Sequence, residues 1–124
     1  MGQPKKIVLL DDDEDILALL ELSLQSAGYN PILCYNPTAL VDLAAREQPS
    51  LIVLDIVMPQ MDGFTLNKKL KENPATKDIP VIIASGKGKM AGLFKLTPGS
   101  NIAGFLEKPF TSDMLISKVR EVIG

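Results

Sequence analysis

The stretch IVLLDDDEDI, residues 7–16, sets four bulky apolar residues directly before five consecutive acids, residues 11–15. The run KKIVLL at residues 5–10 is apolar without alternation, which is typical of a strand buried on both faces of a parallel sheet. Carboxylates this close in sequence repel one another at neutral pH unless a positive group lies among them. The stretch therefore predicts a buried strand whose carboxyl end carries a cluster of acids.

Short apolar runs alternate with helical patterns along the rest of the chain. Further strands are expected at residues 31–35, 51–55, 81–85 and 103–107, and helices at 13–27, 36–48, 63–72 and from 112 to the end. Gly28 is expected to end the first helix, and Asn36, Asp62 and Thr111 to cap the later ones. The residues expected to face the core are Ile16, Leu19, Leu20 and Leu24 in the first helix and Leu115, Val119 and Val122 in the last.

This alternation predicts an α/β fold, a doubly wound five-stranded parallel sheet with helices on both faces. The expected strand order is the flavodoxin-like 2-1-3-4-5, in which ligands bind in the crevice at the carboxyl ends of strands 1 and 3. Residues 1–124 are expected to form a single domain, with no output domain in this chain. Asp11, Asp12 and Asp55 would then converge at one edge, where Ser85 and Lys108 leave two further strands.

Composition excludes several classes of function. The chain has 124 residues and a net charge of −2, so no general affinity for polyanions and no direct contact with nucleic acid are expected. It has one cysteine, Cys34, which rules out an internal disulfide and suits a reducing compartment. Neither a signal peptide nor a membrane span is expected. A cytoplasmic location is therefore expected. Histidine is absent, which excludes Ser-His-Asp and Cys-His catalysis and a phosphohistidine on this chain.

The three converging carboxylates call for a positive partner. A hard divalent cation such as Mg²⁺ is one candidate, and the Lys108 ammonium is the other. Asp13, Glu14 and Asp15 are instead interpreted as a helix cap and a solvated first helical turn. Acids at these positions cap the helix and interact favourably with its dipole.

Four motifs in order, LLDDDED, LIVLDIVMPQMDG, VIIASG and GFLEKPF, together resemble the receiver domain of bacterial two-component response regulators. The resemblance covers Lys5 to Gly124. It implies that Asp55 is the phosphoacceptor and that Mg²⁺ is held by Asp11, Asp12, Asp55 and the backbone carbonyl of Val57, with Asp12 the more direct ligand of the acid pair. It also implies that the residues that bind the phosphoryl group or switch with it are Ser85, Gly86, Lys108 and Phe105.

The implied function is that of a phosphoacceptor signalling domain in a phosphorelay. A sensor histidine kinase or a histidine phosphotransfer protein would supply the phosphoryl group, and a downstream protein of unknown identity would receive the signal. The surface formed by the fourth helix, strand 5 and the fifth helix is expected to change. The chain is not expected to be a free-standing enzyme, although it would assist its own phosphorylation and dephosphorylation.

Three alternatives compete with this interpretation. A flavodoxin-type nucleotide binder is disfavoured because Asp11 and Asp12 would repel a phosphate. A Mg²⁺-dependent phosphohydrolase would need a second acid two residues beyond the nucleophile, where this chain has Val57. A receiver fold that acts without phosphorylation is the remaining alternative, and it is disfavoured because Asp11, Asp12, Asp55, Ser85 and Lys108 are all present. Two departures from the family are plain: glycines at 86, 88 and 92 predict a short, poorly held fourth helix, and Phe105 replaces the common tyrosine.

Overall fold

The computed structural model describes residues 4–11, 13–55, 63–85, 102–107 and 110–124, and at 55, 63–65 and 85 the backbone alone. Five strands form one sheet in the order β2-β1-β3-β4-β5, with neighbouring strands parallel, which confirms the predicted topology. The strands are β1 (Lys6–Leu10), β2 (Asn30–Cys34), β3 (Leu51–Asp55), β4 (Val81–Ser85) and β5 (Ile102–Glu107). The helices are α1 (Glu14–Ser26), α2 (Leu40–Glu47), α3 (Gly63–Glu72) and α5 (Ser112–Ile123), with a short 3-10 turn, η1 (Pro37–Ala39), before α2.

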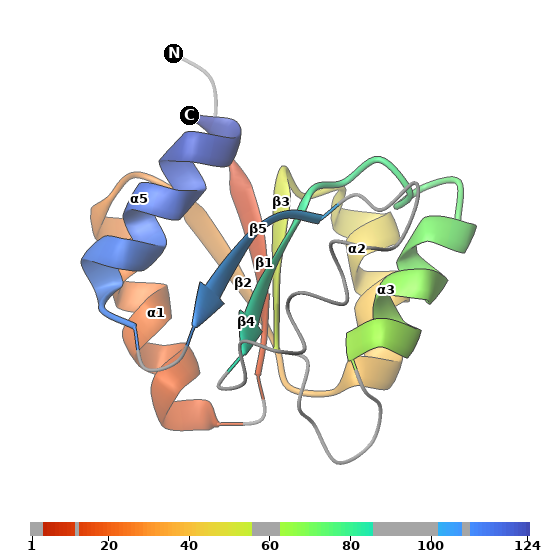
Figure 1. Ribbon diagram of the computed structural model, residues 1–124, viewed down its shortest axis with the longest axis horizontal. Helices are drawn as coiled ribbons and strands as arrows, with labels where there is room; N and C mark the ends of the chain where they lie inside the picture. The colour runs from red at the N-terminus through yellow and green to blue at the C-terminus, as the bar shows by residue number, and fades with distance from the viewer. Residues whose placement is uncertain (1–3, 12, 56–62, 86–101, 108–109) are drawn as a thin grey trace.

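The sheet is covered on both faces, by α1 and α5 on one side and by α2 and α3 on the other (Figure 1). Alternate residues along each strand enter the two cores, as the period of two in a strand requires. In β1, Ile7 and Leu9 pack under α1 and α5, whereas Val8 and Leu10 pack under α2 and α3. None of the helices in the described ranges has both the length and the apolar character needed to span a membrane.

Helix α1 has the predicted caps but a different buried stripe. The carboxylate of Asp13 accepts hydrogen bonds from the Asp15 and Ile16 amides at 3.0 and 3.2 Å, and Gly28 follows the helix at a φ of +95°. The prediction that Leu19 faces the core is wrong: its side chain is 58% exposed, whereas Leu17 is fully buried. At about 100° per residue, Leu19 lies about 160° around the axis from Leu17, which packs against the sheet.

The next two boundaries differ slightly from expectation. Strand β2 ends at Cys34, so Tyr35, expected inside the strand, lies beyond it and is 53% exposed. Asn36 caps as predicted, since its Oδ1 accepts from the Thr38 amide at 3.0 Å, but the first turn is a 3-10 turn. Thr111 also caps as predicted, accepting from the Met114 amide at 3.2 Å. The expected cap Asp62 and the expected fourth helix lie outside the described residues.

The pairing of β4 with β5 contains one irregularity. Val81 pairs with Ile102 but Ile82 pairs with Gly104, so Ala103 is an extra residue in β5, a β-bulge on an edge strand. Beyond the bulge, Gly104 lies under α5: a Cβ atom there would be 2.9 Å from Cδ of Lys118. The glycine thus lets the aliphatic part of Lys118 lie across the strand.

Candidate functional site

The register of the sheet brings the predicted site residues to one edge. Leu10 pairs with Leu54, so the next residues, Asp11 and Asp55, leave adjacent strands at the same level. Asp55 in turn pairs with Ala84, which places Ser85 one residue further along β4. Ser85 pairs with Glu107, the last residue of β5. The carboxyl ends of β1, β3, β4 and β5 therefore meet where the sequence places acids, a hydroxyl and, after Glu107, a lysine.

Asp11 is the best described member of this group. It is only 5% exposed, and its Oδ1 accepts a hydrogen bond from the Asp13 amide at 3.0 Å. A buried carboxylate needs such donors because burial without them disfavours its charged form. The hydrogen bond fixes the orientation of Asp11 at the edge of the sheet beside β3.

Asp13 supports this arrangement twice. Its backbone amide holds Asp11, and its side chain caps α1, whose first turn also contains the exposed acids Glu14 and Asp15. Acids at a helix N-terminus interact favourably with the helix dipole. The preference for a capping role at Asp13 is confirmed.

Several predicted site residues lie outside the described part of the structure. These are Asp12, Val57, Gly86 and Lys108, together with the side chains of Asp55 and Ser85. Among the described side chains, no group of three or more His, Cys, Asp or Glu residues is placed to hold a metal ion. The predicted magnesium ligands include Asp12 and Asp55, whose side chains fall outside that set, so their assignment stays a prediction.

Phe105 is half-buried and packs against the core cluster beneath α2 and α3. Its neighbour Leu106 is buried on the opposite face, under α5. Between β5 and α5 there is an open groove of about 490 Å³. It is lined by Phe105, Leu106, Glu107, Asp113, Met114, Ser117, Lys118 and Glu121. The groove belongs to the surface that was expected to change on phosphorylation.

Sequence reasoning missed two features beside the site. Tyr35 follows Cys34, which pairs with Leu10, so this exposed tyrosine stands level with Asp11. Burial raises the pKa of the Cys34 thiol, which donates a hydrogen bond to the Asn36 carbonyl at 3.2 Å. Pro37 occupies the first position of η1, and Asn36 caps that turn. These two residues are the sequence signal that could have placed the end of β2 at Cys34.

Comparisons with known proteins agree with this geometry. The family model for the response regulator receiver domain matches residues 7–120. The response regulator PleD of Caulobacter vibrioides is 39% identical in an alignment 122 residues long, which covers 94% of this chain and 26% of PleD. The chain spans about a quarter of PleD and about half of another relative, the transcriptional regulatory protein YxdJ of Bacillus subtilis, which is 30% identical.

The fold is also found in solved structures. A sensor protein from Polaromonas sp. JS666 superposes with a TM-score of 0.87 at 26% identity, covering 98% of this chain and 97% of that one. The receiver domain of the sensor histidine kinase PA1611 from Pseudomonas aeruginosa, solved with a magnesium ion coordinated in its active site cleft, shares the fold with a TM-score of 0.83 at 22% identity and covers 98% of both chains. With the family model matched over nearly its whole length and a strand order that agrees, this chain belongs to the response regulator receiver domain family.

Proposed function

We propose that this chain accepts a phosphoryl group on Asp55 from a phosphohistidine of a partner protein, in a reaction that depends on Mg²⁺. The observation that carries the proposal is the register of the sheet, which sets Asp11 level with Asp55 and brings the ends of β4 and β5 to the same edge. Membership of the receiver family supports the same assignment. The donor histidine belongs to another protein, because this chain has none.

The chemistry asks little of the chain beyond positioning and charge. A carboxylate oxygen of Asp55 attacks the phosphorus atom, the bond from phosphorus to the imidazole nitrogen breaks with its electron pair going to nitrogen, and the ring, already protonated on its other nitrogen, leaves as neutral imidazole. Because nucleophile and phosphoryl group are both anionic, neutralising their charge is the main requirement. Lys108 offers an ammonium to one phosphoryl oxygen, and the Ser85 hydroxyl and the Gly86 amide offer hydrogen bonds to others.

The oxygen donors at this edge fit Mg²⁺. Asp11, Asp12 and Asp55 offer carboxylates and Val57 a backbone carbonyl, the hard ligands that this ion prefers. Asp11 is already buried and oriented by the Asp13 amide, as a ligand near a metal should be. When bound, Mg²⁺ supplies positive charge beside the phosphoryl oxygens.

The response is proposed to spread through the fourth-helix segment, β5 and α5. Ser85 and Lys108 border residues 86–107, the fourth-helix segment and β5, at the two ends in the sequence, so groups that follow the phosphoryl oxygens would move both ends. The open groove between β5 and α5, which includes the half-exposed Met114, offers a partner a surface whose shape depends on β5. Phe105 lies at the rim of this groove and is proposed to change its burial.

Incubation with Mg²⁺ and a small phosphoryl donor such as acetyl phosphate, followed by intact mass measurement, tests the proposal. The wild-type chain should gain one phosphoryl group, and the Asp55→Asn variant should gain none. Lys108→Ala should still become phosphorylated but should lose the change in hydrogen exchange across β5 and α5. No increment in the wild type would favour a receiver that acts without phosphorylation. Continuous release of phosphate from unrelated phosphate esters would favour the phosphohydrolase.

A further inference from the structure

Helix α1 carries an exposed apolar ridge. Leu19 and Leu22 are 58% and 63% exposed, the two most exposed large apolar side chains in the described part of the chain. Asp15, Leu19, Leu22 and Ser26 recur at the 4-3-4 spacing that puts residues on one side of a helix, the side turned away from the sheet. Adjacent exposed leucines rimmed by polar residues are typical of a surface that contacts another protein.

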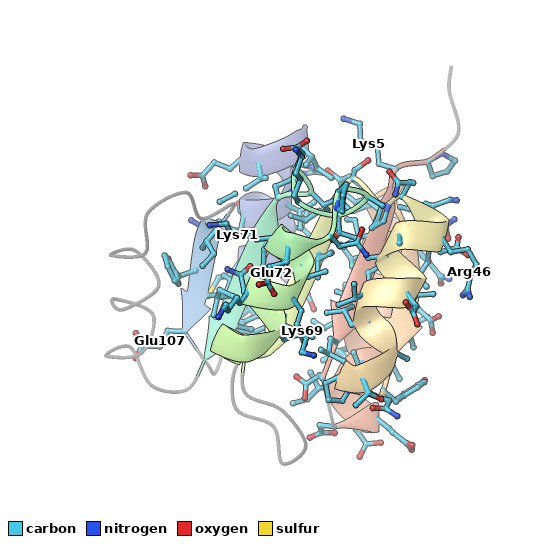
Figure 2. All side chains as sticks on the ribbon, turned by 90° about the vertical axis from the view of Figure 1, so that its right-hand side faces the viewer. Lys5, Arg46, Lys69, Lys71, Glu72 and Glu107 are labelled. Atoms are coloured by element: carbon cyan, nitrogen blue, oxygen red, sulfur yellow. The ribbon has the colours of Figure 1, made fainter. Side chains whose placement is uncertain are left out.

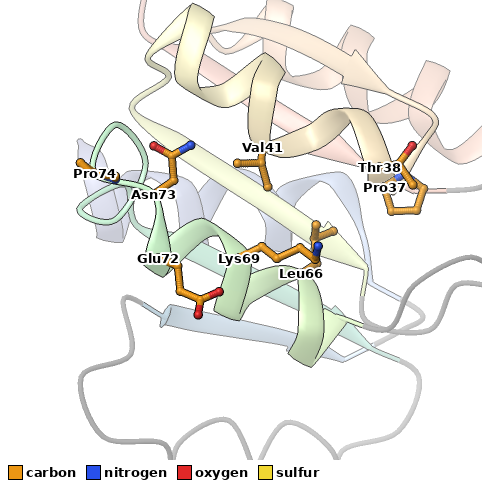
Figure 3. Close-up of a pocket in the computed structure, with 8 residues that line it drawn as sticks. All are labelled: Pro37, Thr38, Val41, Leu66, Lys69, Glu72, Asn73 and Pro74. Atoms are coloured by element: carbon orange, nitrogen blue, oxygen red, sulfur yellow. The ribbon is translucent and has the colours of Figure 1, made fainter.

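A groove of complementary character lies on the opposite face of the molecule, between α2 and α3 (Figure 3). Its volume is about 600 Å³, and its apolar lining consists of the partly exposed Val41 and the buried Leu66 and Pro37. The exposed side chains of Lys69 and Glu72 stand along α3 at its edge, and Lys69 extends along the groove toward Leu66 (Figure 3). A ridge of leucines could therefore bury its own apolar surface against Val41 here and still leave the charged groups at the rim in water.

The charges of the two helices are opposite. Helix α1 contains three acids, Glu14, Asp15 and Glu21, and no basic residue. Helix α3 contains three lysines and one glutamate, and Figure 2 shows Lys69, Lys71 and Glu72 projecting from it. Pairing α1 with a second α1, or α3 with a second α3, would bring like charges together, whereas α1 on α3 brings opposite charges together.

One molecule cannot make this contact with itself, because α1 and α3 cover opposite faces of the sheet (Figure 1). We propose that the occupant of the groove between α2 and α3 is the ridge of a second copy of this chain, with Leu19 and Leu22 over Val41 and Leu66 and with Asp15 near Lys69. The contact joins two different surfaces, so each added copy brings one further ridge and one further groove, and the assembly grows head to tail rather than stopping at a closed dimer. This association goes beyond the proposed phosphorylation and does not depend on it.

Sedimentation velocity at rising protein concentration tests the association. A contact at the small end of the range for protein interfaces should raise the weight-average mass between about 10 μM and about 1 mM. Raising the salt to about 0.5 M should shift the curve to higher concentration, because exposed charges are then screened. A mass that stays at one copy throughout overturns the proposal.

Two pairs of substitutions on exposed positions separate the surfaces. The ridge variant carries Leu19→Ser and Leu22→Ser, and the groove variant carries Thr38→Glu and Lys69→Glu. Each alone should stay at one copy per particle. An equimolar mixture should form particles of two copies and stop there, because only one ridge and one groove remain intact. Failure of the mixture to pair overturns the head-to-tail arrangement.

Controls keep the test specific. Met114→Ser and Tyr35→Ser remove exposed apolar side chains that lie outside both surfaces, and should leave the association of the wild-type chain unchanged. If either abolishes it, the contact has been assigned to the wrong surface. Urea unfolding verifies that each variant is folded. Phosphorylation by the small donor should be the same in both variants, so this test and that of Asp55 fail or succeed separately.

Discussion

Replacing Asp13 by alanine should destabilise the domain and loosen the predicted metal site at the same time. The substitution removes the acceptor for the Asp15 and Ile16 amides, which lie 3.0 and 3.2 Å from Oδ1. Loss of an Asp cap to alanine costs about 1 kcal/mol, and loss of its charge at the helix N-terminus costs about 0.3–1 kcal/mol more. The free energy of unfolding should therefore fall by about 1–2 kcal/mol, and the midpoint temperature by about 4–8 °C for a domain of this size.

Asp13→Asn is the matched control, because asparagine keeps a side-chain acceptor for the amides and loses only the charge. In urea unfolding followed by circular dichroism, with the m-value held common, the expected order of stability is wild type, then Asp13→Asn, then Asp13→Ala. The difference in the free energy of unfolding between the two variants measures the contribution of the capping hydrogen bonds. Equal stability of Asn and Ala at this position would refute the capping argument.

The same pair of variants tests the link to Asp11. The Asp13 amide donates to the buried Asp11 carboxylate, so fraying of the first turn of α1 should speed exchange of that amide in the metal-free protein. Mg²⁺ should raise the midpoint temperature of Asp13→Asn about as much as that of the wild type and that of Asp13→Ala less. An equal response in all three would show that the orientation of Asp11 does not depend on this turn.

Three further predictions follow from the packing and the charges. Leu17→Ala should cost about 3–5 kcal/mol because Leu17 is fully buried, whereas Leu19→Ala should stay within about 0.5 kcal/mol; similar losses in denaturant unfolding would contradict the observed stripe. Gly28→Ala should destabilise by about 1 kcal/mol, since φ is +95° with no steric contact to blame, and an unchanged midpoint would argue against a left-handed cap. Lys6, 3.3 Å from Glu47, holds the pKa of that carboxyl below its usual 4.5, so its contribution to stability is present above about pH 4.5 and is lost as pH falls through the lowered pKa; wild type and Glu47→Gln should differ at neutral pH in low salt and converge in acid.

The strands were predictable because their composition leaves few choices. Runs such as Leu51–Asp55 and Val81–Ser85 are too short and too apolar to be anything but buried strands between helical segments. The caps at Asn36 and Thr111 were predictable for a related reason, since a side-chain acceptor before a helical pattern has a definite role.

What sequence could not decide is which side of a helix faces the sheet when apolar residues surround it. Helix α1 has leucines at 17, 19, 20, 22 and 24, and a stripe through Leu19 or one through Leu17 satisfies helical spacing equally well. Packing against β1 and β2 selects the second. The edge position of Asp11 and Asp55 was predictable from strand ends alone, but strand ends do not specify the hydrogen bond from the Asp13 amide to the Asp11 carboxylate.

The extra residue in β5 decides on which face of the sheet the Phe105 side chain lies. Ile102 and Phe105 both pack toward α2 and α3 although they are three residues apart, which an unbroken strand would forbid. Deleting Ala103 would remove the bulge and leave Ile102 and Phe105 two positions apart, so both would stay on their present face in an unbroken strand. Straightening the strand at its present length would instead exchange the two faces from Gly104 onward, burying the phenyl ring under α5 and turning Leu106 away from it. Any graft of β5 between receivers therefore has to carry either this bulge or a strand one residue shorter, because an unbroken strand of the same length would place Phe105 in the wrong core.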